Sequence, residues 1–419
     1  MFILLIAVTL TGSEGLLRLL TLLSGGLPMN GLNIAYFAFD QFIPSEHAGF
    51  VHTFSIVKAL RDIGNNVVLY GIPNGLDLFN LLKWQDNYKG IPVNYTRFVV
   101  SFKLKYRLFS LLNIVSYNRI LNLVKKQNPD IIHERFHVPN PYSIKIGKKL
   151  NIPKVLEVNS LYIEEGVYSG RAKEIALEQR KKLFEQCKAI ITQTETLKNV
   201  ISHLTDKPIY VVPNGVDTEM FRPDVYCEDV KRELDIGDEI IITFVGSFKK
   251  WHGIEQIPKI AKRFEGKKIK FILIGSGELF DYIKRIKTEN MILLGAKPHE
   301  EIPKYLALSD ILIAPFNDDY FKGSEFWWNP VKLFEYMSSG KPVVSYDYKE
   351  VRKIVRDAGL LAKPGDLNDF IRKLEYLTED ENLRKRLGKR GRKIAVKEYD
   401  WKIRAKQIVE VYEEVLKRF

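Results

Sequence analysis

Residues 268–278, KIKFILIGSGE, join a strand-length apolar run to a glycine turn, and this combination decides the fold class. The run Lys268–Ile274 is mostly apolar, as expected for a strand that is covered on both faces of a sheet. Gly275 and Gly277 follow it directly, and glycines at such a turn let backbone N–H groups approach a phosphate closely. A dinucleotide fingerprint would need a third glycine at position 280, which is Phe280. A plain tight turn therefore explains the two glycines equally well.

The same alternation of apolar strands and amphipathic helices continues in both directions from this stretch. A helix is predicted at Val51–Asp62, and Gly64 is placed to stop it. Alternating helices and nearly all-apolar strands indicate parallel sheets covered on both faces, so the fold class is α/β with two Rossmann-like doubly wound domains. The predicted strands are Asn33–Phe39, Val67–Ile72, Ile131–His133, Val155–Val158, Ala189–Gln193, Ile209–Val212, Glu239–Val245, Lys268–Ile274, Met291–Leu294, Ile311–Ala314 and Val343–Tyr346.

A polar break at Asp217–Gly237 separates the two series of strands. It predicts an N-terminal domain at residues 29–212 and a C-terminal domain at residues 213–398, facing a central cleft. Ligands of open α/β sheets bind at the carboxyl ends of the strands. The loops that follow the strands are therefore expected to carry the chemistry.

Composition excludes several classes of protein. The chain has 419 residues, of which 46% are hydrophobic and 27% charged, so disorder, collagen and coiled coil are ruled out. Two cysteines, Cys187 and Cys227, cannot form a disulfide framework and indicate a reducing compartment. The formal net charge of +13 favours anionic partners: phosphorylated small molecules, anionic lipid or nucleic acid.

Residues 1–28 differ from the rest of the chain. The apolar run Phe2–Leu10 is too short to span a bilayer, and no basic residue precedes it as in a signal peptide. An extraneous or loosely ordered leader is the favoured interpretation, and a membrane-touching helix is the alternative.

The sequence His133-Glu134-Arg135-Phe136-His137 matches the H-E-x-x-H signature of zinc proteases. That signature requires a helix, which places both imidazoles on one face. Here it follows a strand-like run and meets Pro139 and Pro141, which disfavour a helix. We therefore interpret these residues as the end of a strand that lines a cleft.

Residues 329–340, NPVKLFEYMSSG, have the pattern of a well-capped helix. Asn329 suits the N-cap, Pro330 the first helical position and Gly340 the residue past the end. The free N–H groups and positive dipole end of such a helix suit a diphosphate. Lys332 and Glu335 lie three residues apart on one face, where a surface salt bridge is the alternative interpretation.

From about Gly31 onward the chain resembles the retaining GT-B glycosyltransferases of family four. The stretches that carry the resemblance are HAGFVH (47–52), LEVNSLYIEE (156–165), VVPNGVDTEMFRP (211–223), VGSFKKWHGIEQ (245–256), FILIGSGE (271–278), PVKLFEYMSSGKPVV (330–344) and YDWKIRAKQIVEVYEEV (399–415). The resemblance implies an acceptor-side first domain, a second domain for the nucleotide-sugar donor, and a helix at 399–419 that crosses back to the first domain.

The resemblance also implies roles for individual residues. Glu335 matches the second glutamate of the E-x7-E pattern, which holds the donor ribose, and Lys332 could neutralise the diphosphate. The backbone from Pro330 to Leu333 would face that diphosphate. The implied donor-site residues are Gly49, Gly246, Ser247, Lys250, Gly253, Gly275, Gly277, Lys297, Asn329, Pro330, Val331, Leu333 and Glu335, and the implied catalytic residues are Lys332, His252 and Arg135.

Some positions depart from the family pattern. Ser247 replaces the arginine of the phosphate loop and His252 its lysine, so Lys249, Lys250 and Lys332 are the candidates for the missing charge. Trp327 replaces the first glutamate of E-x7-E, with Glu325 as its nearest substitute, and Arg135 stands where the family has a histidine. W-H-G and K-L-F-E-Y-M resemble the signatures of a known branch, so these departures do not exclude activity.

Two basic runs remain. KLKYR at Lys103–Arg107 begins an aromatic stretch that could lie on an anionic membrane, and Arg384–Lys397 holds eight basic residues. A solvated helix face is the favoured interpretation of each. No nucleic-acid motif accompanies them, so nucleic acid is not expected as a partner. Asp318-Asp319 is interpreted as part of a polar loop.

Together these features predict a retaining glycosyltransferase that moves a sugar from a UDP- or GDP-type donor to a glycan or lipid-linked acceptor. The donor is a co-substrate, and neither a cofactor nor a metal is expected. A cytoplasmic protein, with peripheral contact at the inner face of the membrane, is predicted. A nucleotide-sugar epimerase and a non-catalytic nucleotide-sugar-binding protein are the alternatives.

The interpretation of the H-E-x-x-H segment can be tested directly. Purified protein is expected to contain well under one equivalent of zinc, and a chelator should leave donor turnover unchanged. Stoichiometric zinc that is lost together with activity in His137→Ala would contradict it.

Overall fold

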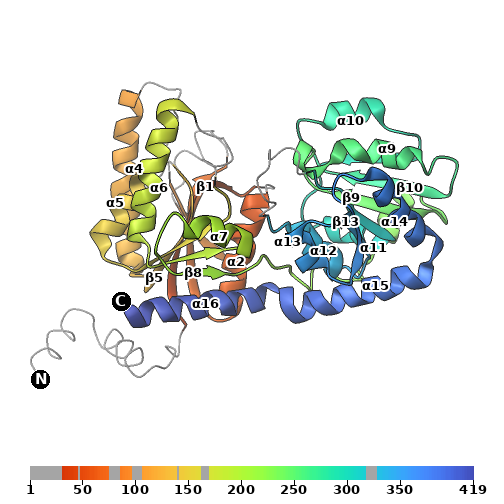
Figure 1. The fold of residues 1–419 in the computed structure, drawn as a ribbon. Coiled ribbons are helices and arrows are strands. Elements are labelled where there is room, and N and C mark those ends of the chain that lie inside the picture. The colour runs from red at the N-terminus through yellow and green to blue at the C-terminus, as the bar shows by residue number, and fades with distance from the viewer. Residues whose placement is uncertain are drawn as a thin grey trace, which may run out of the picture. The chain divides into compact units, whose positions relative to one another are not determined.

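The computed structural model describes residues 31–45, 48–74, 85–96, 106–138, 141–161, 169–317 and 328–419 (Figure 1). Several predictions lie outside these residues: those on the leader 1–28, Lys103, Lys105, Asp318-Asp319, Glu325 and Trp327. The described chain forms two compact units. The first comprises the described residues up to Ile191 with Ser202–Tyr210 and Ala405–Phe419, and the second comprises Thr192–Ile201 and Val211–Arg404.

The first unit is built on a sheet with the strand order β3-β4-β2-β1-β5-β6-β7-β8. Strands β2, β1, β5 and β6 pair in parallel, and β3 pairs antiparallel with β4. The strands are β1 (Asn33–Ile43), β2 (Asn66–Pro73), β3 (Gln85–Tyr88), β4 (Ile91–Tyr95), β5 (Ile131–Arg135), β6 (Lys154–Val158), β7 (Ala189–Thr192) and β8 (Ile209–Val211). Helices α2 (Ala48–Asp62), α4 (Tyr106–Gln127), α5 (Pro141–Leu150) and α6 (Gly170–Gln186) also belong to this unit.

The second unit is built on a parallel sheet with the strand order β11-β10-β9-β12-β13-β14. Its strands are β9 (Ile240–Val245), β10 (Ile269–Ile274), β11 (Met291–Gly295), β12 (Ile311–Ala314), β13 (Val343–Tyr346) and β14 (Gly359–Ala362). Its helices are α7 (Glu195–Ser202), which extends one residue beyond it, α8 (Glu228–Glu233), η1 (Lys250–His252), η2 (Ile254–Gln256), α9 (Ile257–Lys262), α10 (Phe280–Ile286), α11 (Ile302–Leu308), α12 (Val331–Ser338), α13 (Lys349–Val355), α14 (Leu367–Glu379), α15 (Glu381–Ile394) and the π-helical η4 (Ala395–Tyr399).

The predicted fold class is confirmed, and every predicted strand is present. In the described ranges, three further strands were not predicted: β3, β4 and β14. The last helix, α16 (Trp401–Arg418), begins in the second unit and belongs to the first unit from Ala405 onward. In the first unit the Tyr412 hydroxyl lies 2.6 Å from Nδ1 of His133 on β5.

Helix α15 packs against α12 through glycines. A Cβ atom on Gly388 would lie 1.9 Å from the carbonyl oxygen of Gly340, and one on Gly391 would lie 3.3 Å from the Cα of Met337. Gly340 ends α12 with φ = 69°, the left-handed conformation predicted for the residue past the helix end. The two helices can therefore approach closely only because these positions lack side chains.

Arg392 stabilises the contact between α15 and α12 through hydrogen bonds. Its Nη1 donates to the carbonyl oxygens of Thr218, Phe221 and Ser338 at 2.7, 2.9 and 3.2 Å, and to the Ser338 hydroxyl at 3.0 Å. Hydrogen bonds from a charged donor are stronger than neutral ones. One guanidinium therefore holds α15, the end of α12 and the segment after β8 together.

Gly388→Ala is expected to lower the free energy of unfolding by about 1–3 kcal/mol, the usual effect of overpacking a filled interior. The higher helix propensity of alanine, worth up to about 1 kcal/mol, opposes this loss but does not remove the clash with the Gly340 carbonyl. Thermal unfolding is the measurement. Lys389→Ala, on the exposed side of α15, is the control and should change stability by less than about 0.5 kcal/mol. A more stable Gly388→Ala protein would contradict the packing.

Candidate functional site

The predicted start of α12 needs a correction. The helix begins at Val331 with Pro330 at the N-cap, one residue later than predicted, and Asn329 does not cap it. Instead the Asn329 side-chain oxygen accepts the backbone N–H of Asn214 at 2.6 Å, and the Asn214 amide donates to the Asn329 carbonyl at 2.5 Å. This buried reciprocal pair fixes the entry of the chain into α12. Among the residues that the structure describes, no side chain caps the helix start.

The helix start offers a small number of backbone donors. Pro330 has no N–H, and the N–H of Leu333 donates to the Pro330 carbonyl at 3.1 Å. The amides of Val331 and Lys332 are the first of the helix, and such groups have no acceptor within a helix. They supply donors and the positive end of the helix dipole for an anion.

Lys332 is buried, with only 8% of its surface exposed. Its Nζ lies 3.0 Å from Nδ1 of His252, 4.3 Å from the centre of the Phe244 ring and 5.5 Å from that of Phe316. Burial lowers the pKa of Lys332 to about 7, and Glu335 opposes this shift. The lysine is therefore poised to take up a proton when a negative charge arrives.

His252 is kept neutral. Burial, and then the charges of Lys332 and Lys249, hold the pKa of His252 well below its ordinary value. When Lys332 is charged it can only donate, so Nδ1 of His252 then accepts and the ring proton lies on Nε2. A neutral imidazole in this tautomer can donate one hydrogen bond to an anion.

Glu335 is also buried, and its partner is His299. The Nε2 atom of His299 lies 2.8 Å from Oε1 of Glu335, and the ring of Phe221 lies 5.3 Å from that of His299. His299 follows β11, two residues beyond the predicted Lys297. The alternative of a surface salt bridge between Lys332 and Glu335 is wrong, because both side chains are buried and bond to different histidines.

The glycines of the site bring its loops together. A Cβ on Gly246 would lie 2.4 Å from Nζ of Lys332, so this position must be small for the lysine to fit. A Cβ on Gly275 would lie 1.8 Å from the Gly246 carbonyl oxygen, and one on Gly277 would lie 2.8 Å from that of Phe248. Gly253, with φ = 66°, leaves room for the Pro315 carbonyl. Close packing thus explains all four glycines, and phosphate contact at Gly275 and Gly277 stays a prediction.

The other predicted donor-site residues lie around this centre. The Ser247 carbonyl accepts the Lys249 N–H at 3.0 Å, and Lys250 opens η1 with an exposed side chain. Lys249 lies 4.7 Å from the centre of the Trp251 ring. Lys297 lies over Tyr305, with its Nζ 5.9 Å from the ring centre. Of the three candidate lysines Lys249, Lys250 and Lys332, Lys332 is the one whose Nζ lies within hydrogen-bond distance of His252.

In the first unit, Arg135 ends β5 and pairs with Asp40 of the neighbouring strand β1. The Nε–Oδ2 distance is 2.9 Å, and both side chains are almost fully buried. Gly49 lies in the first turn of α2, where an added Cβ would meet the Gln41 side chain at 2.7 Å. Gln41 in turn donates to Asp40.

The segment that matches H-E-x-x-H lies at the end of a strand, as predicted: β5 ends at Arg135, and Phe136 and His137 follow it. His133 lies on β5, and its Nε2 is 3.0 Å from Oε2 of Glu157, while Tyr36 donates to the same oxygen at 2.6 Å. Burial would raise the pKa of Glu157, but His52 and His133 hold it well below its usual range. Among the described residues, no three or more His, Cys, Asp or Glu side chains are grouped to hold a metal ion.

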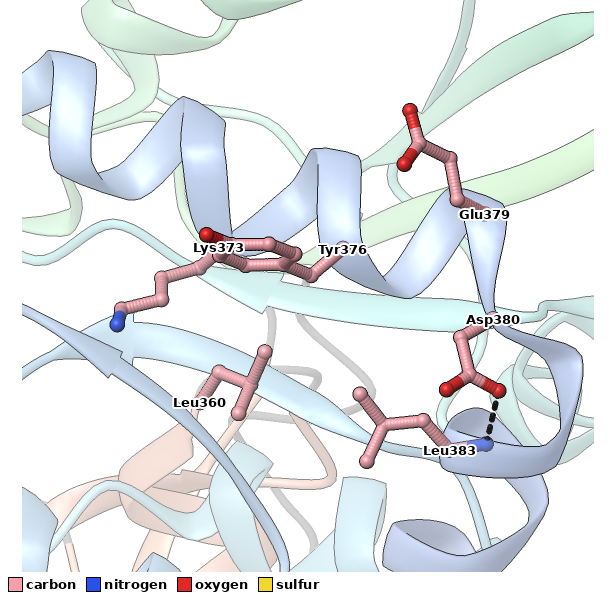
Figure 2. A pocket seen from close by; sticks show the side chains of 6 residues that line it. All are labelled: Leu360, Lys373, Tyr376, Glu379, Asp380 and Leu383. Carbon is pink, nitrogen blue, oxygen red and sulfur yellow. Dashed lines mark hydrogen bonds between the residues drawn. The ribbon is translucent and has the colours of Figure 1, made fainter.

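A surface pocket of about 270 Å³ lies elsewhere in the second unit (Figure 2). None of the predicted site residues lines it; its lining residues are Leu360, Lys373, Tyr376, Glu379, Asp380 and Leu383. Asp380 accepts the backbone N–H of Leu383 at 2.8 Å and so caps α15. In the described ranges, no helix combines the length and the apolar character needed to cross a membrane.

Two family models match the chain. The model of the glycosyl transferases group 1 matches residues 228–394, and that of glycosyltransferase family 4 matches residues 50–220. The two matches together take in the larger part of both units.

Relatives of known sequence are similar over most of their length. An uncharacterised glycosyltransferase of Methanocaldococcus jannaschii is 25% identical over 375 residues, which are 87% of this chain and 94% of the relative. The N,N'-diacetylbacillosaminyl-diphospho-undecaprenol alpha-1,3-N-acetylgalactosaminyltransferase of Campylobacter jejuni is 25% identical over 316 residues, 71% of this chain and 80% of the relative.

Solved structures share the fold. A sucrose-phosphate synthase of Thermosynechococcus elongatus superposes with a TM-score of 0.71 at 16% identity, covering 92% of this chain and 99% of the other. Anabaena HepE, solved in complex with UDP and glucose, superposes with a TM-score of 0.69 at 15% identity, covering 91% and 99%. This chain belongs to the glycosyl transferases of group 1 and has the GT-B fold.

Proposed function

We propose that this protein is a retaining glycosyltransferase that moves a sugar from a UDP- or GDP-type donor to a glycan or lipid-linked acceptor. The observation that carries the proposal is the buried Lys332, held beside His252 at the start of α12. A buried cation with a neutral neighbour is stabilised by a bound anion. The leaving diphosphate of a nucleotide sugar is an anion of this kind.

The chemistry follows from this arrangement. As the bond from the sugar to the diphosphate breaks, negative charge grows on the departing oxygen. Preorganised donors stabilise such charge at the transition state. Here these donors would be the ammonium of Lys332, Nε2–H of His252 and the amides of Val331 and Lys332. The acceptor hydroxyl then attacks from the face that the diphosphate leaves, so the anomeric configuration is retained.

The proton of the acceptor hydroxyl needs a base. Arg135 cannot be that base, because a guanidinium stays protonated in proteins. The donor phosphate itself is therefore the proposed acceptor of the proton, and the charge of Arg135 is already paired with Asp40 in the first unit. With Lys332 supplying the positive charge, we propose a metal-independent reaction.

Glu335 is proposed to bind the donor ribose. One of its oxygens, Oε1, is engaged by His299, and a carboxylate has further acceptor sites for two hydroxyl groups. For the acceptor, the name of the Campylobacter jejuni relative specifies a diphospho-undecaprenol substrate. A lipid-linked acceptor would place the reaction at the cytoplasmic face of a membrane.

Glu335→Ala is expected to weaken the binding of a nucleoside diphosphate about 10- to 150-fold, because hydrogen bonds to a charged group contribute roughly 1.5–3 kcal/mol. Calorimetric titration with UDP and with GDP measures this loss and shows which nucleotide binds. Glu379→Ala, at an exposed glutamate in the same unit, is the matched control and should bind like the wild type. Unchanged affinity in Glu335→Ala, with a melting curve that shows a folded protein, would remove the donor site from α12.

The affinity for a nucleoside diphosphate is expected to fall by up to about tenfold per pH unit above pH 7. The pKa of Lys332 is about 7 without ligand, and the diphosphate requires the charged form, so binding above this pH must take up a proton. Titration at pH 8 in buffers of different ionisation enthalpy measures the uptake.

Two variants at the same position control the pH experiment. Lys332→Ala should show no proton uptake, and its kcat should fall more than its KM rises, since the charge matters most as the diphosphate leaves. Lys332→Arg keeps a charge at all accessible pH values and should bind independently of pH between 7 and 9. Equal uptake by Lys332→Ala and wild type would assign the proton to another group.

A further inference from the structure

The outward face of α15 and η4 carries a row of cations. Arg386, Lys389, Lys393 and Lys397 are exposed and follow one another at spacings of three and four residues. Such spacings place side chains on one side of a helix. At 1.5 Å per residue the row is about 16 Å long. We call these four residues the basic row; Figure 1 shows α15 at the edge of the second unit.

The basic row differs from the other basic residues of the segment. Lys385 pairs with Glu381 at 2.6 Å and Arg390 with Asp357 at 2.5 Å. Arg384 and Arg392 donate to backbone carbonyls. None of the four residues of the row, by contrast, has an ion-pair partner in the part of the chain that the structure describes. Glu398, beside Lys397, is bound by Arg356.

The fold does not require this row. The opposite side of the segment, formed by Leu387, Gly388, Gly391 and Ala395, is buried and makes the packing contact. Like charges four residues apart, as in Lys389–Lys393 and Lys393–Lys397, destabilise a helix. The packing of the segment therefore makes no use of the row, and its four cations face solvent, where a partner can reach them.

We propose that the basic row binds the anionic surface of a membrane. A straight row of unpaired cations complements an extended negative surface, to which Lys and Arg side chains are attracted additively. Val396, 44% exposed between Lys393 and Lys397, adds an apolar contact for such a surface. Stacking aromatics, which single-stranded nucleic acids require, do not interrupt the row. The inference rests on the proposed function, because binding to a membrane would bring the enzyme to a lipid-linked acceptor.

Vesicle sedimentation of the full chain tests the proposal. Wild-type protein should sediment with vesicles that contain phosphatidylglycerol, should not sediment with phosphatidylcholine alone, and should be released by salt, which screens surface charge. Lys389→Glu combined with Lys393→Glu should lower the partition coefficient by at least about 25-fold, since each lysine near an anionic surface contributes about fivefold. Melting curves confirm that the variants are folded.

The matched control is Lys259→Glu combined with Lys262→Glu, two exposed lysines of α9 in the same unit. It changes the net charge equally and should sediment like the wild type. Equal losses in both variants, or none in the basic-row variant, would overturn the proposal. Variant-sensitive binding of single-stranded RNA without vesicle binding would overturn it in favour of nucleic acid. Affinity for UDP or GDP, measured on the same variants, should not change. This measurement distinguishes a failure of the membrane proposal from a failure of the proposed donor site.

Discussion

The burial of one ammonium group constrains the whole of the candidate site. Nζ of Lys332 is surrounded by the rings of Phe244 and Phe316, the imidazole of His252 and the glycine at position 246. A buried charge is costly unless it is paired, and contact with aromatic rings compensates only about 2 kcal/mol of that cost. The end of β9, η1, the end of β12 and the start of α12 must therefore all be in place before the lysine can be accommodated.

Much of the fold could be predicted because the strands are apolar runs of a definite length. Those of the second unit, such as IIITFV and IKFILI, are buried along most of their length, and burial produced the pattern. The strands that escaped prediction are short, and β3 is polar as well: its sequence is QDNY, and it is half exposed at the edge of the sheet. Pairing with β4, rather than burial of its own side chains, keeps β3 extended.

The parts of the site that depend on residues close in sequence could be predicted, and those that depend on contacts between distant segments could not. The spacing of Lys332 and Glu335 on one helix, and the prolines after His137, are visible in the sequence and led to correct placements. The prediction that Asn329 caps α12 was wrong. The Asn329 side chain instead accepts a hydrogen bond from Asn214, which is 115 residues away and cannot be identified as a partner from the sequence. His299 was missed for the same reason: it meets Glu335 only after the loop beyond β11 is packed beside α12.

The bond between His133 and Tyr412 has a consequence for synthesis of the protein. The first unit includes Ala405–Phe419, so His133 on β5 waits for a hydrogen-bond partner, Tyr412, that the ribosome makes 279 residues later. At about 5–20 residues per second, the 194 residues between Tyr210 and Ala405 take roughly 10–40 s to translate. During that interval α16 has not been made, and His133 lacks the Tyr412 hydroxyl. A chain that stops before Tyr412 leaves Nδ1 of the buried His133 without this hydroxyl, and a buried polar atom that loses its hydrogen-bond partner is costly.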